Sequence, residues 1–169
     1  MTEPRVMISY TSGAARFNFR AAGIALRQRH VLVHRAQWDS HWSLPGGRVE
    51  MGEQSALALG REVEEELGVA GDVGALRFIM ENFFSYDGTR FHELGFYYAL
   101  GLPERFPFRE DGSVCHTCID GPAELEFKWV PAEAQTLEAI GFQPARLRGR
   151  LLDPLGDPVH IVHAEEGAR

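Results

Sequence analysis

Cysteine and long apolar runs are scarce in this 169-residue chain, and each scarcity excludes a class of protein. Two cysteines do not make the disulfide framework of a small secreted domain. No apolar run approaches the roughly 18 residues of a membrane-spanning helix. The N-terminus lacks the basic and then apolar pattern of a signal peptide. We therefore expect a cytoplasmic protein with no membrane partner.

Positive charge is scarce too. The chain has 17 Lys and Arg against 24 Asp and Glu, a net charge of −7, and no basic patch. This balance argues against duplex nucleic acid as the main partner. Repeats and low-complexity stretches are lacking, and 44% hydrophobic content is enough for a full core. We expect residues 1–169 to form one domain.

Carboxylates, by contrast, are concentrated in one segment. At about 100° per residue on a helix, Glu62, Glu65 and Glu66 share one face, whereas Glu64 points almost the opposite way. Three like charges at this spacing repel one another and would weaken an isolated helix. Divalent cations would neutralise them, and hard oxygen ligands suit Mg²⁺ or Mn²⁺. The spacing predicts a metal site.

A solvated acidic helix would account for these glutamates alone. It would not account for Glu53 or for the Gly46-Gly47 turn that precedes them. An apolar stripe on the other face predicts packing on a core, at Ala56, Leu59, Val63 and Leu67. Gly60 is costly inside a helix, so we expect a neighbouring element to pack closely there, and Gly68 is expected to end the helix.

Taken together, residues 47–69 resemble the Nudix box of the Nudix hydrolases at every fixed position. Seven glycine or charged positions match without substitution, and Trp42 to Gly47 is similar to the loop that leads into the box. The resemblance implies the Nudix fold, a mixed β-sheet between α-helices, and the element order along the chain fits an α/β sandwich. It also implies a metal-dependent hydrolase of a nucleoside diphosphate linked to a group X, such as a nucleotide sugar, ADP-ribose or a nucleoside triphosphate.

Carried over by position, the resemblance gives roles to individual residues. Glu62, Glu65 and Glu66 would be metal ligands, with the Gly46 carbonyl as an extra one, and Glu65 and Glu66 are expected to contribute most. Glu53 and Arg61 would brace the loop and helix. The physical argument agrees, because cleaving a polyanion requires charge neutralisation and a positioned water, which Mg²⁺ or Mn²⁺ supplies. The resemblance also allows a homodimer.

The remaining elements follow from local patterns. Strands are predicted at 17–27, 31–35, 73–84, 90–100, 126–130 and 159–163, with turns at 28–30 and 87–88. Residues 103–122 read as a polar loop. Helices are predicted from Pro131 to Ile140 and from Pro144 to Leu152.

Several residues outside the box are candidate substrate contacts, each with a structural alternative. Arg20, Arg35 and Arg48 could meet phosphate oxygens or be surface arginines. Phe83 belongs to an aromatic group around the turn at 87–88, of which some could stack on a base, although core packing is the stronger interpretation. Glu93 faces either a cleft or solvent. The resemblance suggests one further acidic ligand or base, for which the candidates are Glu81, Glu93, Glu124 and Glu126.

Cys115 and Cys118 suggest a zinc site, but a structural site usually has two separated ligand pairs, and no second cysteine pair exists. We expect an ordinary loop there. The same fold also hosts non-catalytic ligand sensors, usually with an eroded box and an added DNA-binding domain. An isomerase of isoprenoid diphosphates would need a cysteine in the cleft. The intact box favours the hydrolase.

Overall fold

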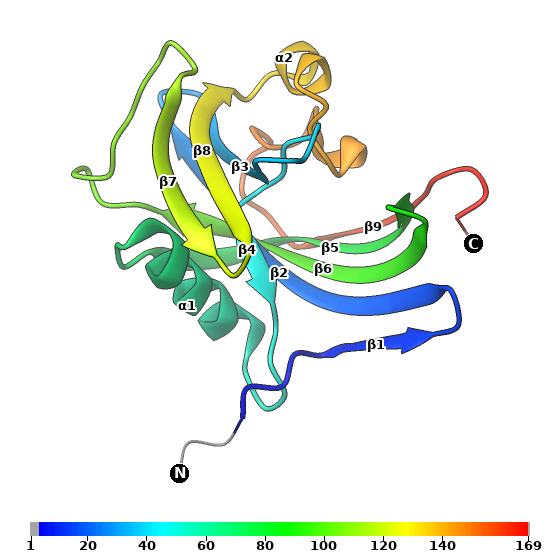
Figure 1. The fold of residues 1–169 in the computed structure, drawn as a ribbon. Helices are drawn as coiled ribbons and strands as arrows, with labels where there is room; N and C mark the ends of the chain where they lie inside the picture. The colour runs from blue at the N-terminus through cyan, green and yellow to red at the C-terminus, as the bar shows by residue number, and fades with distance from the viewer. Residues whose placement is uncertain (1–3, 169) are drawn as a thin grey trace.

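The computed structural model describes residues 4–168, in which nine strands form a single mixed sheet (Figure 1). The strand order is β7-β8-β3-β2-β6-β5-β9, and β1 and β4 also pair with β2. The first five strands are β1 (Ser9–Ser12), β2 (Ala15–Arg27), β3 (His30–Ala36), β4 (Gly46–Arg48) and β5 (Asp72–Tyr86). The others are β6 (Thr89–Gly101), β7 (Val114–Asp120), β8 (Ala123–Pro131) and β9 (Val159–Ala164).

Strand β2 organises the sheet, because it pairs with four other strands. It runs parallel to β6 along most of its length and antiparallel to β1, β3 and β4. Only two residue pairs join β2 to β3, so the β3-β8-β7 part of the sheet splays away from the β2-β6-β5-β9 part, as Figure 1 shows.

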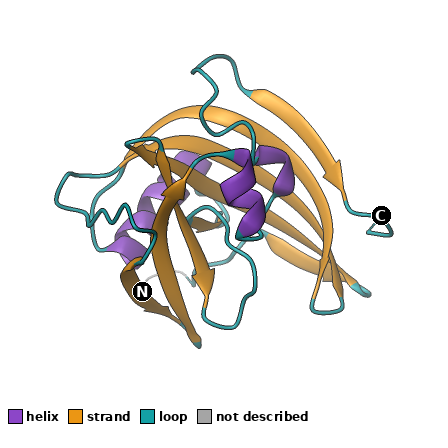
Figure 2. Ribbon diagram, turned by 90° about the horizontal axis from the view of Figure 1, so that it is seen from above, coloured by secondary structure: helices purple, strands orange, loops and turns teal. Residues whose placement is uncertain are grey.

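Helices cover both faces of the sheet (Figure 2). On one side α1 (Ser55–Leu67) contributes Leu59, Val63 and Leu67 to a core that includes Ala21 and Ala25 of β2. On the other side lie α2 (Ala134–Ala139) and the 3-10 helix η1 (Ala145–Leu147), which pack on a second core. Residues 21–25 of β2 are all buried, and they contribute to both cores because successive side chains point to opposite faces of the sheet. The predicted α/β sandwich is confirmed.

Most predicted strands are present with boundaries within two or three residues, and the hairpin turn is confirmed by positive φ at Asp87 (47°) and Gly88 (74°). The helix from 55 ends as expected, with Gly68 in the left-handed region at φ 66°. Within residues 4–168, no helix is long and apolar enough to cross a membrane.

Four expectations were wrong. The predicted loop at 103–122 contains β7, which pairs antiparallel with β8. Pro131 ends β8 rather than starting a helix, and residues 144–152 form only the short η1. A Cβ on Gly60 would meet nothing within 4 Å, so close packing does not explain that glycine.

Candidate functional site

Two glycines allow β4 to lie between β2 and α1. A Cβ on Gly46 (φ 146°) would come within 2.1 Å of the Ala21 carbonyl oxygen. A Cβ on Gly47 would lie 2.3 Å from the carboxyl carbon of Glu62. The expected turn at Gly46-Gly47 is therefore the start of a short strand, and its lack of side chains brings backbone directly against a helix carboxylate.

Arg61 is the centre of an ion-pair network on the same helix. Its Nε donates to Glu53 Oε1 at 2.8 Å and its Nη2 to Glu53 Oε2 at 3.0 Å, a bidentate pair. Its Nη1 donates to Glu62 at 2.6 Å, and its Nη2 also reaches the Arg48 carbonyl at 3.3 Å. The hydrogen bond from Arg61 lowers the pKa of Glu53. These contacts tie the loop before α1 to the middle of the helix.

A second arginine approaches from the N-terminal segment. Arg5 donates to Glu65 Oε1 at 2.9 Å and pairs with Glu50. Glu65 is also 3.4 Å from Arg61. Side chains of Glu62 and Glu65 are therefore already matched by positive charge from within the chain.

Glu66 is different, because it is buried without a matching cation. It is 7% exposed, and burial together with the nearby Glu62 carboxylate raises its pKa to about 8. Its near neighbour is His34, whose Nδ1 lies 3.8 Å from Glu66 Oε2. Burial and then Arg20 lower the pKa of His34 to about 3, so its imidazole is neutral at pH 7. His34 Nδ1 is buried and forms no hydrogen bond to any described residue.

These groups surround a cavity of about 400 Å³, here called the carboxylate cavity. Its lining includes Glu62, Glu65, Glu66, Asp120, Arg20, His34, Gly46, Gly47 and Arg48. The atoms that could ligate a metal here are carboxylate oxygens next to backbone carbonyl oxygens, and these are the ligands that Mg²⁺ and Mn²⁺ prefer. The raised pKa of Glu66 means that the metal-free site disfavours its charged form, which a bound cation would favour, so the residues present fit a divalent metal ion.

The side chains are not gathered into coordination geometry. Among residues 4–168, no three His, Cys, Asp or Glu side chains are arranged so that they could hold a metal ion. A cation would have to compete with Arg5 for Glu65 and with Arg61 for Glu62. The structure thus brings the three predicted ligands to one cavity and leaves their coordination open.

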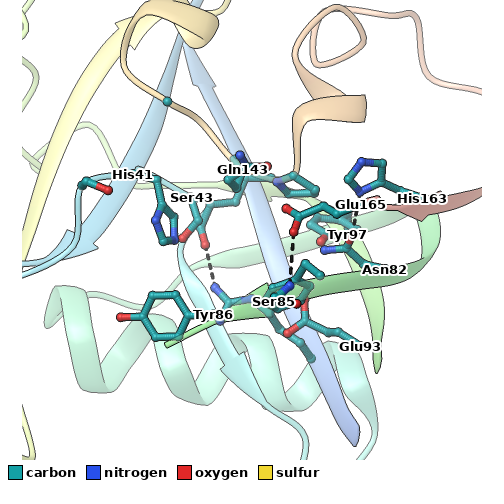
Figure 3. Close-up of a pocket in the computed structure, with 16 residues that line it drawn as sticks. His41, Ser43, Asn82, Ser85, Tyr86, Glu93, Tyr97, Gln143, His163 and Glu165 are labelled. Carbon is teal, nitrogen blue, oxygen red and sulfur yellow. Dashed lines mark hydrogen bonds between the residues drawn. The ribbon is translucent and has the colours of Figure 1, made fainter. Parts of the chain in front are cut away.

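A second cavity of about 450 Å³, here called the side cavity, is drawn in Figure 3, and Arg20 is part of the lining of both cavities. Arg20 donates to the Leu44 carbonyl at 2.9 Å. Glu93 lines the side cavity, and its pKa is raised by burial, with Arg20 and Arg48 acting in the opposite direction. The predicted Phe83 lines neither cavity; its ring stacks on His92, with centroids 4.4 Å apart.

The other acidic candidates are placed elsewhere. Glu81 pairs with His160 at 2.9 Å, and Glu126 pairs with Arg35 at 3.0 Å. Glu124 is exposed. None of these three lines either cavity. Glu93 is therefore the one of the four described candidates that lines a cavity, and Arg20 and Arg48 act on its carboxyl group.

Cys115 and Cys118 lie on β7 and are both free thiols. Burial raises the pKa of each, so neither is an activated thiolate. His116, between them, bonds the backbone carbonyl of Glu66 at 2.8 Å. The segment therefore supports α1 rather than forming a metal site of its own.

Sequence reasoning missed several residues of the two cavities. His34 and Asp120 reach the carboxylate cavity from β3 and β7, and Asn82, His163 and Glu165 reach the side cavity from β5, from β9 and from just beyond β9. No local motif marks them, because the sheet topology alone brings them together.

Comparison with known proteins adds an independent observation. The model of the NUDIX domain matches residues 17–146. Among curated proteins, diphosphoinositol polyphosphate phosphohydrolase 2 of Rattus norvegicus is 40% identical over 70 residues, which is 39% of this chain and 39% of that protein. A putative mutator protein MutT4 of Mycobacterium tuberculosis is 39% identical over 59 residues, 35% of this chain and 24% of that one. The chain thus aligns with well under half the length of these relatives.

Solved structures support the fold over a longer span. A mutator MutT protein from Bacillus halodurans superposes with a TM-score of 0.59 at 16% identity, covering 88% of this chain and 92% of that one. An ADP-ribose pyrophosphatase from Streptococcus suis superposes with a TM-score of 0.56 at 15% identity, covering 85% and 98%. At such identities the likeness shows a shared fold.

Proposed function

Because this chain belongs to the NUDIX family, we propose that it is a metal-dependent hydrolase that cleaves the diphosphate of a nucleoside diphosphate linked to another group X. Nucleotide sugars, ADP-ribose and nucleoside triphosphates are the candidate substrates. The observation that carries the proposal is the buried Glu66 carboxylate, with Glu62 and Glu65 beside it in one cavity. The names of the relatives support it, since they describe phosphohydrolases and a pyrophosphatase.

Glu62, Glu65, Glu66 and the Gly46 carbonyl would hold Mg²⁺ or Mn²⁺. When bound, the cation supplies neutralisation of phosphate charge and a water activated for attack. The box carboxylates hold the charge that attracts the cation to this cavity. The cation also lowers the repulsion between a chain of net charge −7 and a diphosphate, so it strengthens binding of the substrate.

The other box residues position rather than react. Glu53 and Arg61 form the bidentate pair that fixes the loop before α1, which keeps Gly46 and Gly47 against the helix carboxylates. We assign substrate contacts to Arg20 and Arg48, whose guanidinium groups line the carboxylate cavity and suit phosphate oxygens. Glu93 lines the side cavity together with Arg20 and would be a further substrate contact.

The proposal concerns a small molecule rather than duplex nucleic acid, because a net charge of −7 disfavours binding to the phosphates of a duplex. The relatives also include enzymes named for a polyphosphorylated inositol, so such a compound belongs in the first set of substrates to be tested.

A hydrolysis screen with matched variants tests this function. Wild type, Glu65→Gln and Glu64→Gln are compared on nucleoside triphosphates, ADP-ribose, nucleotide sugars and a diphosphoinositol polyphosphate, with Mg²⁺ or Mn²⁺. Glu65 lines the carboxylate cavity, whereas Glu64 lies exposed on the opposite face of α1, so both variants remove one charge from the same helix.

We expect one compound to be turned over by wild type and by Glu64→Gln. Glu65→Gln should be about 10²- to 10⁴-fold slower, since a metal ligand contributes several kcal/mol to the transition state and 1.36 kcal/mol is a factor of ten. Equal rates for wild type and Glu65→Gln would contradict the assignment. Folded, metal-loaded wild type that hydrolyses none of these compounds would contradict the proposed function.

A further inference from the structure

The C-terminal segment 159–165 lies beyond the part of the chain that matches the family domain, yet it forms part of the side cavity. Strand β9 adds to the edge of β5 in parallel, from Phe78↔Val159 to Phe83↔Ala164. We propose, resting on the function proposed above, that this segment selects the group X or the base. It would do so through Glu165, which accepts two adjacent hydrogen-bond donors from an uncharged ring.

Glu165 is held in place by two contacts with β5. Its backbone N–H donates to the Phe83 carbonyl at 2.9 Å, and its Oε2 accepts from the Ser85 N–H at 3.1 Å. Figure 3 shows the Glu165 carboxylate directly above Ser85. A carboxylate offers about four acceptor sites, so this single bond leaves capacity for a pair of ligand donors. The side chain is exposed, and the bond from Ser85 orients its carboxylate.

Asn82 and His163 provide the complementary donor. His163 Nδ1 lies 2.8 Å from Asn82 Oδ1, and because an amide oxygen only accepts, His163 donates (Figure 3). Asn82 is 8% exposed, and with its oxygen engaged its amide group is left to donate into the cavity. An acceptor at Glu165 and a donor at Asn82 thus occupy one wall of the side cavity.

The charge of the side cavity indicates which rings it excludes. Of the described residues that line it, Arg20 is the only Lys or Arg, and it already donates to the Leu44 carbonyl. Glu93 and Glu165 are acidic, and burial lowers the pKa of His163, which keeps it neutral at pH 7. A ring carrying several phosphates would meet the Glu165 carboxylate with a single arginine to balance its charge, whereas an uncharged ring would not be repelled.

The position of the side cavity suits the distal part of a substrate whose diphosphate lies at the box. Arg20 lines both cavities, so a diphosphate that contacts Arg20 would lie beside the side cavity. Tyr86 and His41 provide aromatic surface on another side, with ring centroids 5.9 Å apart, and Tyr86 Oη donates to Asp39 at 2.6 Å. A flat or cyclic group therefore meets an aromatic edge and a polar wall.

Two kinds of ring carry adjacent donors: a base with neighbouring N–H groups, as in guanine, and a sugar with vicinal hydroxyls. Chemical-shift titrations without divalent metal measure affinity in the absence of hydrolysis and separate the two. One arm compares GDP with IDP, which lacks the exocyclic amine. The other compares ADP-ribose with an analogue whose distal ribose lacks the 2-hydroxyl group.

Each arm is run on wild type, Glu165→Gln and Glu166→Gln. Glutamine keeps the shape of Glu165 and an oxygen for the Ser85 N–H, so the fold is retained. Glu166 is exposed and lies outside the lining, so its variant is the matched control. We expect wild type to prefer the donor-bearing ligand by about tenfold in one arm, since hydrogen bonds to a charged group are worth about 1.5–3 kcal/mol. The ratio should fall toward one in Glu165→Gln and persist in Glu166→Gln.

A ratio near one in both arms of wild type would overturn the inference, and so would a ratio that Glu165→Gln retains. Inositol hexakisphosphate that binds wild type more tightly than GDP and shifts the Asn82 and His163 resonances would overturn it as well. Because the readout is binding without metal, these results are independent of turnover. Binding without hydrolysis would refute only the proposed function, and hydrolysis without this discrimination would refute only the inference.

Discussion

Replacing Glu66 by glutamine should make the metal-free protein more stable, and increasingly so as the pH rises. Burial raises the pKa of Glu66 from a usual 4.5 to about 8, with Glu62 adding to the effect. The folded state therefore disfavours the charged carboxylate. For a group with a raised acid pKa, stability is highest below the unfolded value and is lost as the pH rises between the two values.

The magnitude follows from the two pKa values. Each pKa unit is worth 1.36 kcal/mol, so ionisation of Glu66 in the unfolded chain, where its pKa is lower, reduces the stability of the wild-type fold by about 3 kcal/mol at pH 7. The cost approaches 5 kcal/mol, on the order of the full shift, by pH 9. Glutamine cannot ionise and has no such dependence. The neutral His34 is present in both proteins, so its own titration cancels in the difference.

Urea unfolding at pH 5 to 9 in EDTA measures this difference. The stability of Glu66→Gln minus that of wild type should rise steadily across this range. Exposed Glu64→Gln should stay within about 0.5 kcal/mol of wild type throughout. A constant offset between Glu66→Gln and wild type at every pH would refute the reasoning, because a loss of packing or of a hydrogen bond does not titrate.

Three further predictions concern the helix, the strand beside it and the cation. Val63→Asp should unfold the protein at 37 °C, because an unpaired carboxylate in the core costs about 3–5 kcal/mol. Leu57→Asp, on the exposed face of α1, should melt within a few degrees of wild type. Equal circular-dichroism melts for the two variants would refute this assignment of the buried face. Gly47→Ala should keep a native far-UV spectrum but lose at least about tenfold in turnover, because the added Cβ displaces the Glu62 carboxylate, and full activity would contradict that contact. Mn²⁺ at a hundred times its Kd should stabilise wild type by about 2.7 kcal/mol and so raise its melting temperature. The rise should be much smaller in Glu66→Gln. An equal rise in both proteins would mean that the ion binds elsewhere.

The box helix was predictable because its determinants are local. Apolar spacing fixed the buried face of α1, Gly68 marked its end, and the charged spacing placed three carboxylates together. Alternating apolar residues identified the central strands for the same reason. These signals depend on residues within one or two turns of each other.

Other features depend on pairing that the chain does not encode locally. Strand β7 lies between turn residues, and its composition resembles that of a loop. It is an edge strand that is held by pairing with β8, which the local sequence does not reveal. A helix was expected at 144–152, but the segment contains only the short η1. Its apolar residues Leu147 and Leu151 are nevertheless buried in the second core, which explains why their spacing resembled that of a helix. Glu165 lies opposite Ser85 only because β9 adds to β5, which no spacing in the sequence announces.

Hydrolysis in ¹⁸O-labelled water tests the central claim most directly, with the best substrate from the screen and mass analysis of both products. With Mg²⁺ or Mn²⁺ present, wild type should place one ¹⁸O atom in a phosphate group of one product, EDTA should abolish the reaction, and Glu65→Gln should slow it about 10²- to 10⁴-fold. Label that appears outside the phosphates, or turnover that continues in EDTA, would show that the box carboxylates do not direct water to the diphosphate.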